Sequence, residues 1–97
     1  MRVNKLDLRS GEIKAVSESL CVARFEDEVF GFGRYCPHAG ADLSFGYLDG
    51  ARVRCSWHNL PIDLRSGLSP CKSIPRLKLS SVREISAGIL EIDSELR

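Results

Sequence analysis

The feature that most constrains this chain is the placement of its only two histidines, each of which lies beside a cysteine. The first motif is CPH at 36–38 and the second is CSWH at 55–58, with sixteen residues between them. Thiolate sulfur and imidazole nitrogen are metal donors, and two of each suit a structural zinc site or an iron–sulfur centre. The spacing therefore predicts two loops that hold one metal centre from two sides.

Each motif supplies one donor of each kind, which bears on the identity of the metal. Zinc fingers usually keep like donors together, with two cysteines on one turn and two histidines on a helix. A two-iron cluster uses the mixed arrangement if one iron takes Cys36 and Cys55 and the other takes His38 and His58. A plain [2Fe-2S] cluster held by all four cysteines would leave both histidines without a role. The residues alone leave a zinc site open.

The rest of the chain predicts a single all-β domain spanning 1–97. Short β-type runs alternate with turn signals, and no long amphipathic helix is evident. We expect a hairpin with strands at Leu20–Phe25 and Val29–Tyr35, and a second hairpin across Asp49-Gly50 that continues into Arg52–Cys55. A further run begins at Arg76–Leu79 and continues toward Ile85, and Ile89–Ile92 closes the chain. Both Cys/His motifs then fall on loops at strand ends.

Charge is distributed unevenly about the two motifs. The net charge is +1, which gives no case for nucleic-acid binding. Between residues 34 and 78, however, seven basic side chains face three acidic ones, a local balance of +4. No apolar run approaches the roughly 18 residues of a membrane span, and no secretion signal is evident. We therefore expect a cytoplasmic protein that binds no membrane, in which four cysteines favour ligands or free thiols over disulfides.

The segment CPHAGADLSFGYLDGARVRCSWHNLPIDLRSG resembles the signature of the Rieske-type ferredoxins, CPHxGxxLxxGxLDGxxVxCPWHGxxFDLxTG. The resemblance implies a Rieske-type antiparallel β-sandwich with a small cluster-binding subdomain at about 35–75. It also implies one [2Fe-2S] cluster per chain. The ligands would be Cys36, His38, Cys55 and His58, and the shielding residues would be Pro37, Gly40, Trp57 and Pro70, with Pro75 as a second proline candidate.

Three positions place the chain among the low-potential members of that family. High-potential members carry a disulfide between the ligand loops and a serine that donates to the cluster. The corresponding positions here are Ala41 and Trp57 for the disulfide, and Leu60 for the serine. We therefore expect a potential near the bottom of the Rieske range, which runs from roughly −150 to +300 mV.

The resemblance implies an electron carrier that is not itself an enzyme. Such a carrier takes one electron from a flavin-dependent reductase and passes it to a terminal oxygenase or a similar redox enzyme. We expect a monomer, and basic groups around the cluster that dock on an acidic rim of the partner. Two alternatives remain: an accessory subunit of a reductase such as nitrite reductase, and a zinc-stabilised binding module.

A few positions depart from the family pattern or lie outside it. Asn59 replaces a glycine, and we expect it to retain a positive φ. Ile62 replaces an aromatic residue, which predicts different packing behind the second loop. Of the two remaining cysteines, Cys21 is expected to be buried. Cys71 is expected to pack beside the cluster, with a reactive thiol as the alternative.

Overall fold

The computed structural model describes residues 1–37, 40–55 and 59–96. Its centre is a four-stranded antiparallel sheet in the order β2-β3-β4-β8. The long pair is β3 (Leu20–Phe25) and β4 (Glu28–Gly33), flanked by β2 (Ile13–Ala15) and β8 (Leu79–Ser80). The hairpin turn holds Glu26 at φ 55°. The predicted hairpin is therefore confirmed, although its second strand ends at Gly33 rather than Tyr35.

A second sheet joins the two ends of the chain, in the order β1-β10-β9. Its strands are β1 (Arg2–Asn4), β9 (Val82–Ser86) and β10 (Ile89–Ile92). The predicted closing strand at Ile89–Ile92 is confirmed. The single run expected from Arg76 toward Ile85 is wrong, because the chain changes sheets at Ser81: β8 pairs with β4, whereas β9 pairs with β10.

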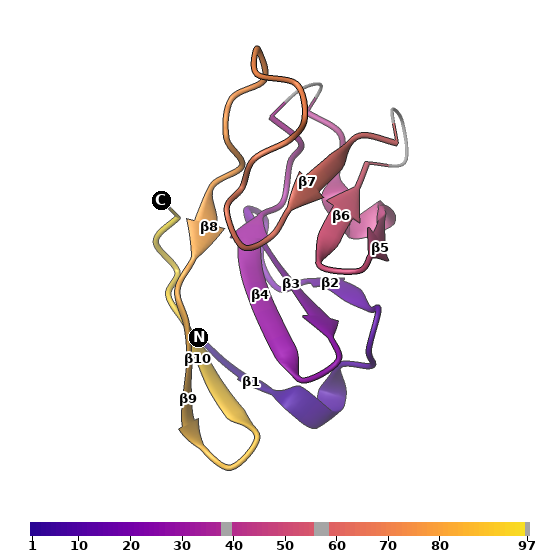
Figure 1. Ribbon diagram of the computed structural model, residues 1–97. Coiled ribbons are helices and arrows are strands. Elements are labelled where there is room, and N and C mark those ends of the chain that lie inside the picture. The colour runs from indigo at the N-terminus through magenta and orange to yellow at the C-terminus, as the bar shows by residue number, and fades with distance from the viewer. Residues whose placement is uncertain (38–39, 56–58, 97) are drawn as a thin grey trace.

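The third sheet carries the second Cys/His motif. It consists of β5 (Tyr47–Asp49), β6 (Arg52–Arg54) and β7 (Pro61–Asp63) in sequential antiparallel order. The predicted hairpin across Asp49-Gly50 is confirmed, with Gly50 at φ 61°. Figure 1 shows this sheet and the loop that follows it at one end of the molecule, and the β9–β10 hairpin turn at the other.

Helical structure in the described part of the chain is limited to two short 3-10 turns, η1 (Lys5–Asp7) and η2 (Leu43–Phe45). The main core lies between the central sheet and the third sheet, and Phe32, Leu43, Val53 and Ile62 are at most 1% exposed there. A smaller core around Leu8, Leu20, Val22 and Ile92 fills the space toward the terminal sheet. Antiparallel sheets packed around these two cores confirm the all-β expectation.

Gly67 fastens the loop at 68–76 to the third sheet. The Leu77 amide donates to the Gly67 carbonyl at 2.9 Å, which closes the base of that loop. Gly67 has φ +77°, and a Cβ there would lie 2.4 Å from the Leu77 carbonyl oxygen. Any side chain at Gly67 would therefore push the two segments apart.

We expect Gly67→Ala to lower the free energy of unfolding by about 3 kcal/mol, because a left-handed backbone penalty adds to an overpacking penalty. Gly50→Ala is the matched control, since Gly50 has φ +61° but no atom within 4 Å of its Cβ position. It should cost only the backbone penalty, about 1 kcal/mol. Denaturant unfolding of both variants checks this, and equal losses would contradict the crowding argument.

Candidate metal centre

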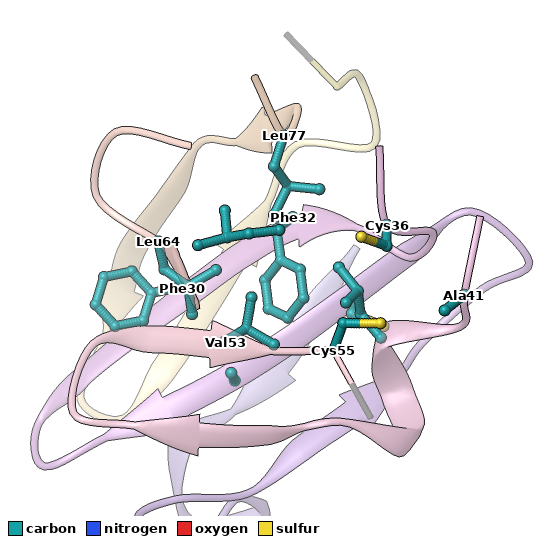
Figure 2. Packing of buried hydrophobic residues seen from close by; sticks show 12 residues of the cluster. Phe30, Phe32, Cys36, Ala41, Val53, Cys55, Leu64 and Leu77 are labelled. Carbon is teal, nitrogen blue, oxygen red and sulfur yellow. The ribbon is translucent and has the colours of Figure 1, made fainter. Parts of the chain in front are cut away.

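The two motif cysteines lie at the ends of neighbouring elements. Cys36 follows the end of β4 by three residues, and Cys55 follows β6 directly. Their side chains are buried, at 3% and 1% exposed. Figure 2 shows both sulfur atoms at the same end of the core, beyond Phe32 and Val53. Both thiols are free, so no disulfide competes for them. The structure therefore brings the two predicted sulfur donors to one end of the sheets.

The loop that begins at Cys36 is a tight turn closed by two backbone hydrogen bonds. The Gly40 amide donates to the Cys36 carbonyl at 2.8 Å, and the Cys36 amide donates to the Ala41 carbonyl at 2.8 Å. Gly40 has φ +72°, and no described atom lies within 4 Å of its Cβ position. Within the protein, the backbone conformation and not crowding therefore requires glycine at position 40.

The loop that begins at Cys55 repeats the same pattern. The Asn59 amide donates to the Cys55 carbonyl at 2.7 Å, and the Cys55 amide donates to the Leu60 carbonyl at 3.4 Å. Asn59 has φ 55°, which confirms that asparagine retains the left-handed conformation where the family has glycine. Each cysteine thus begins a turn whose fifth residue is left-handed. Sequence reasoning missed this repeat, although its signal was present as a glycine or asparagine four residues after each cysteine.

A third turn has the same geometry but no metal donor of this kind. The Gly67 amide donates to the Asp63 carbonyl at 2.7 Å, and the Asp63 amide donates to the Leu68 carbonyl at 2.9 Å. The same turn therefore reverses the chain at three places in this fold, and it is not specific to the Cys/His motifs. What distinguishes the first two turns is the buried cysteine at position one.

The donor chemistry of these turns fits an iron–sulfur cluster. Two free, buried thiols at one end of the core are suitable thiolate ligands. His38, His58 and Trp57 lie outside the described residues. Within residues 1–37, 40–55 and 59–96, no three His, Cys, Asp or Glu side chains gather as a metal site. All four donors, Cys36, His38, Cys55 and His58, therefore stay a prediction.

An ion pair fixes the base of the first loop. Arg34 donates from Nε and Nη2 to Asp42 Oδ2 at 3.0 and 2.8 Å, and from Nη1 to the Ser17 carbonyl. The other carboxylate oxygen accepts from the amide and hydroxyl of Ser44. These contacts, led by the Arg34 hydrogen bond, lower the pKa of Asp42 to about 2. The segment that leads from β4 into the first loop is thereby bonded to the segment that follows this loop.

We expect Asp42→Asn to lower the free energy of unfolding by about 1–2 kcal/mol at pH 7, because a charge-assisted hydrogen bond is lost. A lowered pKa means that the carboxylate stabilises the fold above the unfolded value near 4, and that this contribution is lost only as pH falls toward 2. The difference between wild type and variant should therefore be constant from pH 8 to pH 5. Denaturant unfolding across that range checks it, and a difference that disappears by pH 5 would contradict the assignment.

Gly46 allows the chain after η2 to touch the strand that leads to Cys55. A Cβ at Gly46 would lie 2.4 Å from the Arg54 carbonyl oxygen and 3.2 Å from that of Leu43. Its φ of −79° is ordinary, so close approach and not conformation requires glycine here. Leu43, just before Gly46, is completely buried. The segment between the motifs is thus packed directly on the second loop's strand.

The remaining candidate residues differ in exposure. Pro37 is half-buried beside Cys36, whereas Pro70 and Pro75 are exposed on the 68–76 loop. Cys21 is fully buried as predicted, and burial raises its pKa to about 11. Cys71 is exposed, so it does not pack into the core, and its packing beside the cluster stays a prediction. Its sulfur lies 3.1 Å from the Ser73 hydroxyl, and hydrogen bonding there lowers the pKa of the thiol.

The basic character of the 34–78 segment is retained in three dimensions. Three of its seven basic side chains pair with carboxylates, in Arg34–Asp42, Arg54–Asp49 and Arg65–Glu28. The other four are exposed and have no ion-pair partner among the residues described: Arg52, Lys72, Arg76 and Lys78. Both partner carboxylates within the segment, Asp42 and Asp49, are already neutralised. Asp63 is the one carboxylate of the segment without an ion-pair partner among the described residues, so the unpaired charge of the segment is positive on balance.

No helix among the described residues is long and apolar enough to cross a membrane. The family model for the Rieske [2Fe-2S] domain matches residues 2–83. Among curated proteins, the chain is 37% identical over 60 residues to the anthranilate 1,2-dioxygenase ferredoxin subunit of Burkholderia cepacia, covering 62% of this chain and 56% of that one. The chain thus spans about half the length of this relative, and 11% of the two apoptosis-inducing factor 3 proteins that it also matches.

Solved structures give the same result for the whole fold. The Sphingomonas yanoikuyae B1 ferredoxin has a TM-score of 0.81 and 29% identity, with 98% of each chain covered. A chain from the complex of reduced oxygenase and oxidised ferredoxin in carbazole 1,9a-dioxygenase has a TM-score of 0.83 and 24% identity, covering 99% of this chain and 95% of that one. The Rieske-type β-sandwich expected from the signature is thereby confirmed, and the chain belongs to the Rieske [2Fe-2S] domain family, whose cofactor is a [2Fe-2S] cluster.

Proposed function

We propose that this protein is a one-electron carrier that serves a terminal oxygenase or a similar redox enzyme. The observation that carries the proposal is the pair of matching turns that place Cys36 and Cys55, both buried and free, at one end of a small Rieske domain. When bound, the cluster supplies reversible one-electron exchange. We assign its ligation to Cys36, His38, Cys55 and His58. Relatedness to a dioxygenase ferredoxin subunit supports the same role.

The remaining features of the proposal follow from the size and organisation of the chain. We propose one domain over 1–97, with a cluster-binding subdomain at about 35–75 that consists of the third sheet and the loops around it. A flavin-dependent reductase is the proposed electron donor. The proposed location is the cytoplasm, where free thiols such as those of Cys21 and Cys71 persist. We propose that the carrier is a monomer.

Docking on the electron partner is proposed to use the basic end of the molecule. A groove of about 340 Å³ runs between the first ligand loop and the loop that follows the third sheet, and Tyr35, Pro37 and Pro75 line it. Arg76 and Lys78 also line this groove, and none of its lining residues is acidic. Unpaired positive charge around an apolar groove suits a partner with an acidic rim.

The docking proposal is tested by reduction of the protein by the flavin-dependent reductase of a dioxygenase system at increasing ionic strength. Electrostatic docking predicts that the rate falls steeply with salt, because the Debye length shortens from about 10 Å at 0.1 M to about 3 Å at 1 M. The variant Lys78→Ala should lower the rate at low salt, whereas Lys14→Ala, an exposed position on strand β2, should not. A rate that is insensitive to salt would reject basic docking.

A low potential is part of the proposal. Ala41 is 1% exposed, and Leu60 is half-buried beside the second loop, so the described positions that carry a cysteine and a serine in high-potential members are apolar here. Fewer donors to the cluster leave the reduced form less stabilised. We propose a midpoint near the bottom of the Rieske range. A strongly positive midpoint in a redox titration would reject this subclass.

The decisive experiment is chemical analysis of anaerobically purified protein. The carrier proposal predicts about two irons and two acid-labile sulfides per chain, and an EPR signal that appears on reduction. A colourless chain holding one zinc would establish the binding-module alternative instead. A chain with neither metal would support the accessory-subunit alternative. Retention of the cluster together with reduction by the flavin-dependent reductase supports the carrier.

A further inference from the structure

The second ligand loop has a set of side-chain contacts that the first loop lacks in the described structure. Asn59, the left-handed residue of the second turn, is held at three points. Its amide donates to the Cys55 carbonyl at 2.7 Å, and its carbonyl accepts from Arg54 Nη1 at 3.0 Å. Its side-chain Oδ1 accepts a hydrogen bond from the Tyr47 hydroxyl. The corresponding residue of the first turn, Gly40, has no side chain to be held.

The two side chains that hold Asn59 come from a rigid base. Tyr47 on β5 and Arg54 on β6 are directly paired across the hairpin. The Arg54 guanidinium is fixed in turn by Asp49, with Nε and Nη2 at 3.0 and 2.9 Å from Oδ2. The guanidinium therefore reaches the Asn59 carbonyl from a fixed position. The β5–β6 hairpin therefore sets the position of the turn that contains Asn59.

The left-handed backbone of Asn59 costs conformational free energy, which the contacts of this residue offset. A left-handed backbone costs a residue with a Cβ more than it costs glycine, although asparagine bears it better than most. The side-chain amide gains a hydrogen bond from Tyr47 that glycine could not make. The departure from the family's glycine thus adds a point of attachment to the turn that begins at the ligand Cys55.

We propose that Tyr47, Arg54 and Asn59 form a clamp that positions the second ligand loop on the cluster. They are positioning residues, since none of them supplies a ligand. The inference rests on the proposed function, because a loop can be positioned on a cluster only if the cluster is bound. Outer contacts of this kind orient ligands and tune the metal centre in other metalloproteins.

The test uses the two tyrosines of the chain as a matched pair. Tyr47→Phe removes only the hydroxyl that donates to Asn59. Tyr35→Phe makes the same chemical change on a similarly exposed side chain beside the first loop, at 51% against 50% exposed. Cluster loss is followed by visible absorbance in the presence of an iron chelator, and the EPR spectrum of each reduced holoprotein is recorded.

We expect Tyr47→Phe to lose its cluster roughly three- to tenfold faster than wild type, the effect of one hydrogen bond of ordinary net strength. Its EPR g-values should shift, whereas Tyr35→Phe should match wild type in both measurements. In an Asn59→Gly background, Tyr47→Phe should have no further effect, because its acceptor is gone. Equal behaviour of the two tyrosine variants, or an undiminished Tyr47→Phe effect in the Asn59→Gly background, would overturn the clamp.

The same data separate this inference from the proposed function. If wild-type protein retains no iron–sulfur cluster, the carrier proposal fails, and the clamp fails with it. If wild type and Tyr35→Phe hold the cluster equally and Tyr47→Phe also does so, only the clamp fails. A change in thermal unfolding without any shift in the EPR g-values would show Tyr47 to be merely structural, which also rejects the clamp.

Discussion

Replacing either Cys36 or Cys55 by alanine is expected to abolish the cluster. Each substitution removes one of the two sulfur ligands of the proposed set, and alanine offers no donor in its place. Iron content should fall from about two per chain to nearly zero, and the visible absorbance and the EPR signal should disappear with it. Metal analysis and spectroscopy of anaerobically purified variants provide the measurement.

The other two cysteines are the controls for that experiment. Cys21→Ala removes a thiol that is as fully buried as those of the proposed ligands, so it reports the effect of a lost buried sulfur on folding alone. Cys71→Ala removes an exposed thiol close in sequence to the proposed shield Pro70. Both variants should retain about two irons per chain. Loss of iron in Cys71→Ala together with its retention in Cys36→Ala would contradict the ligand assignment.

Exchanging both histidines for cysteine is expected to lower the midpoint potential by about 250 mV, from the bottom of the Rieske range toward the value of plant-type clusters. Two neutral imidazoles would become two thiolates, so the oxidised cluster would start two charges more negative. Adding an electron to a more negative centre is less favourable. Redox titration of His38→Cys/His58→Cys against wild type provides the measurement.

The two single variants supply the control for the charge argument. Each adds one thiolate, so each should lower the midpoint by part of the full shift. The absorbance and EPR spectra should move toward those of an all-cysteine cluster only in the double variant. A double variant that binds its cluster and keeps the wild-type potential would show that imidazole ligation does not set the potential, and it would remove the histidines from the ligand set.

Local sequence patterns predicted the hairpins and left the sheets undetermined. The β3–β4 turn, the turn after Asp49 and the strand Ile89–Ile92 were all predictable, because turn residues and alternating apolar residues act over a few positions. The pairing of Arg2–Asn4 with β10 joins opposite ends of the chain. Three-residue strands have too little pattern to identify, and their partners are set by packing.

The candidate site was likewise predictable from the sequence only in part. The spacing of the Cys/His motifs predicted the donors, and the structure brings both sulfur donors to one end of the core. The exposure of Cys71 could not be predicted, because its segment belongs to a loop whose path is set by the Gly67–Leu77 contact. The three-point attachment of Asn59 also could not be predicted, since it needs two strands in register beside the loop.

By itself, the sequence determined the donor chemistry, the family signature and the left-handed conformation of Asn59, because these depend on which residue types stand at which spacing. Only the tertiary structure decided that close approach requires glycine at positions 46 and 67, where an added Cβ would lie 2.4 Å from a carbonyl oxygen in each case. It also decided which charges remain unpaired at the cluster end. The physical reason is that spacing is a property of the chain, whereas crowding and charge pairing depend on segments that meet only when the chain folds.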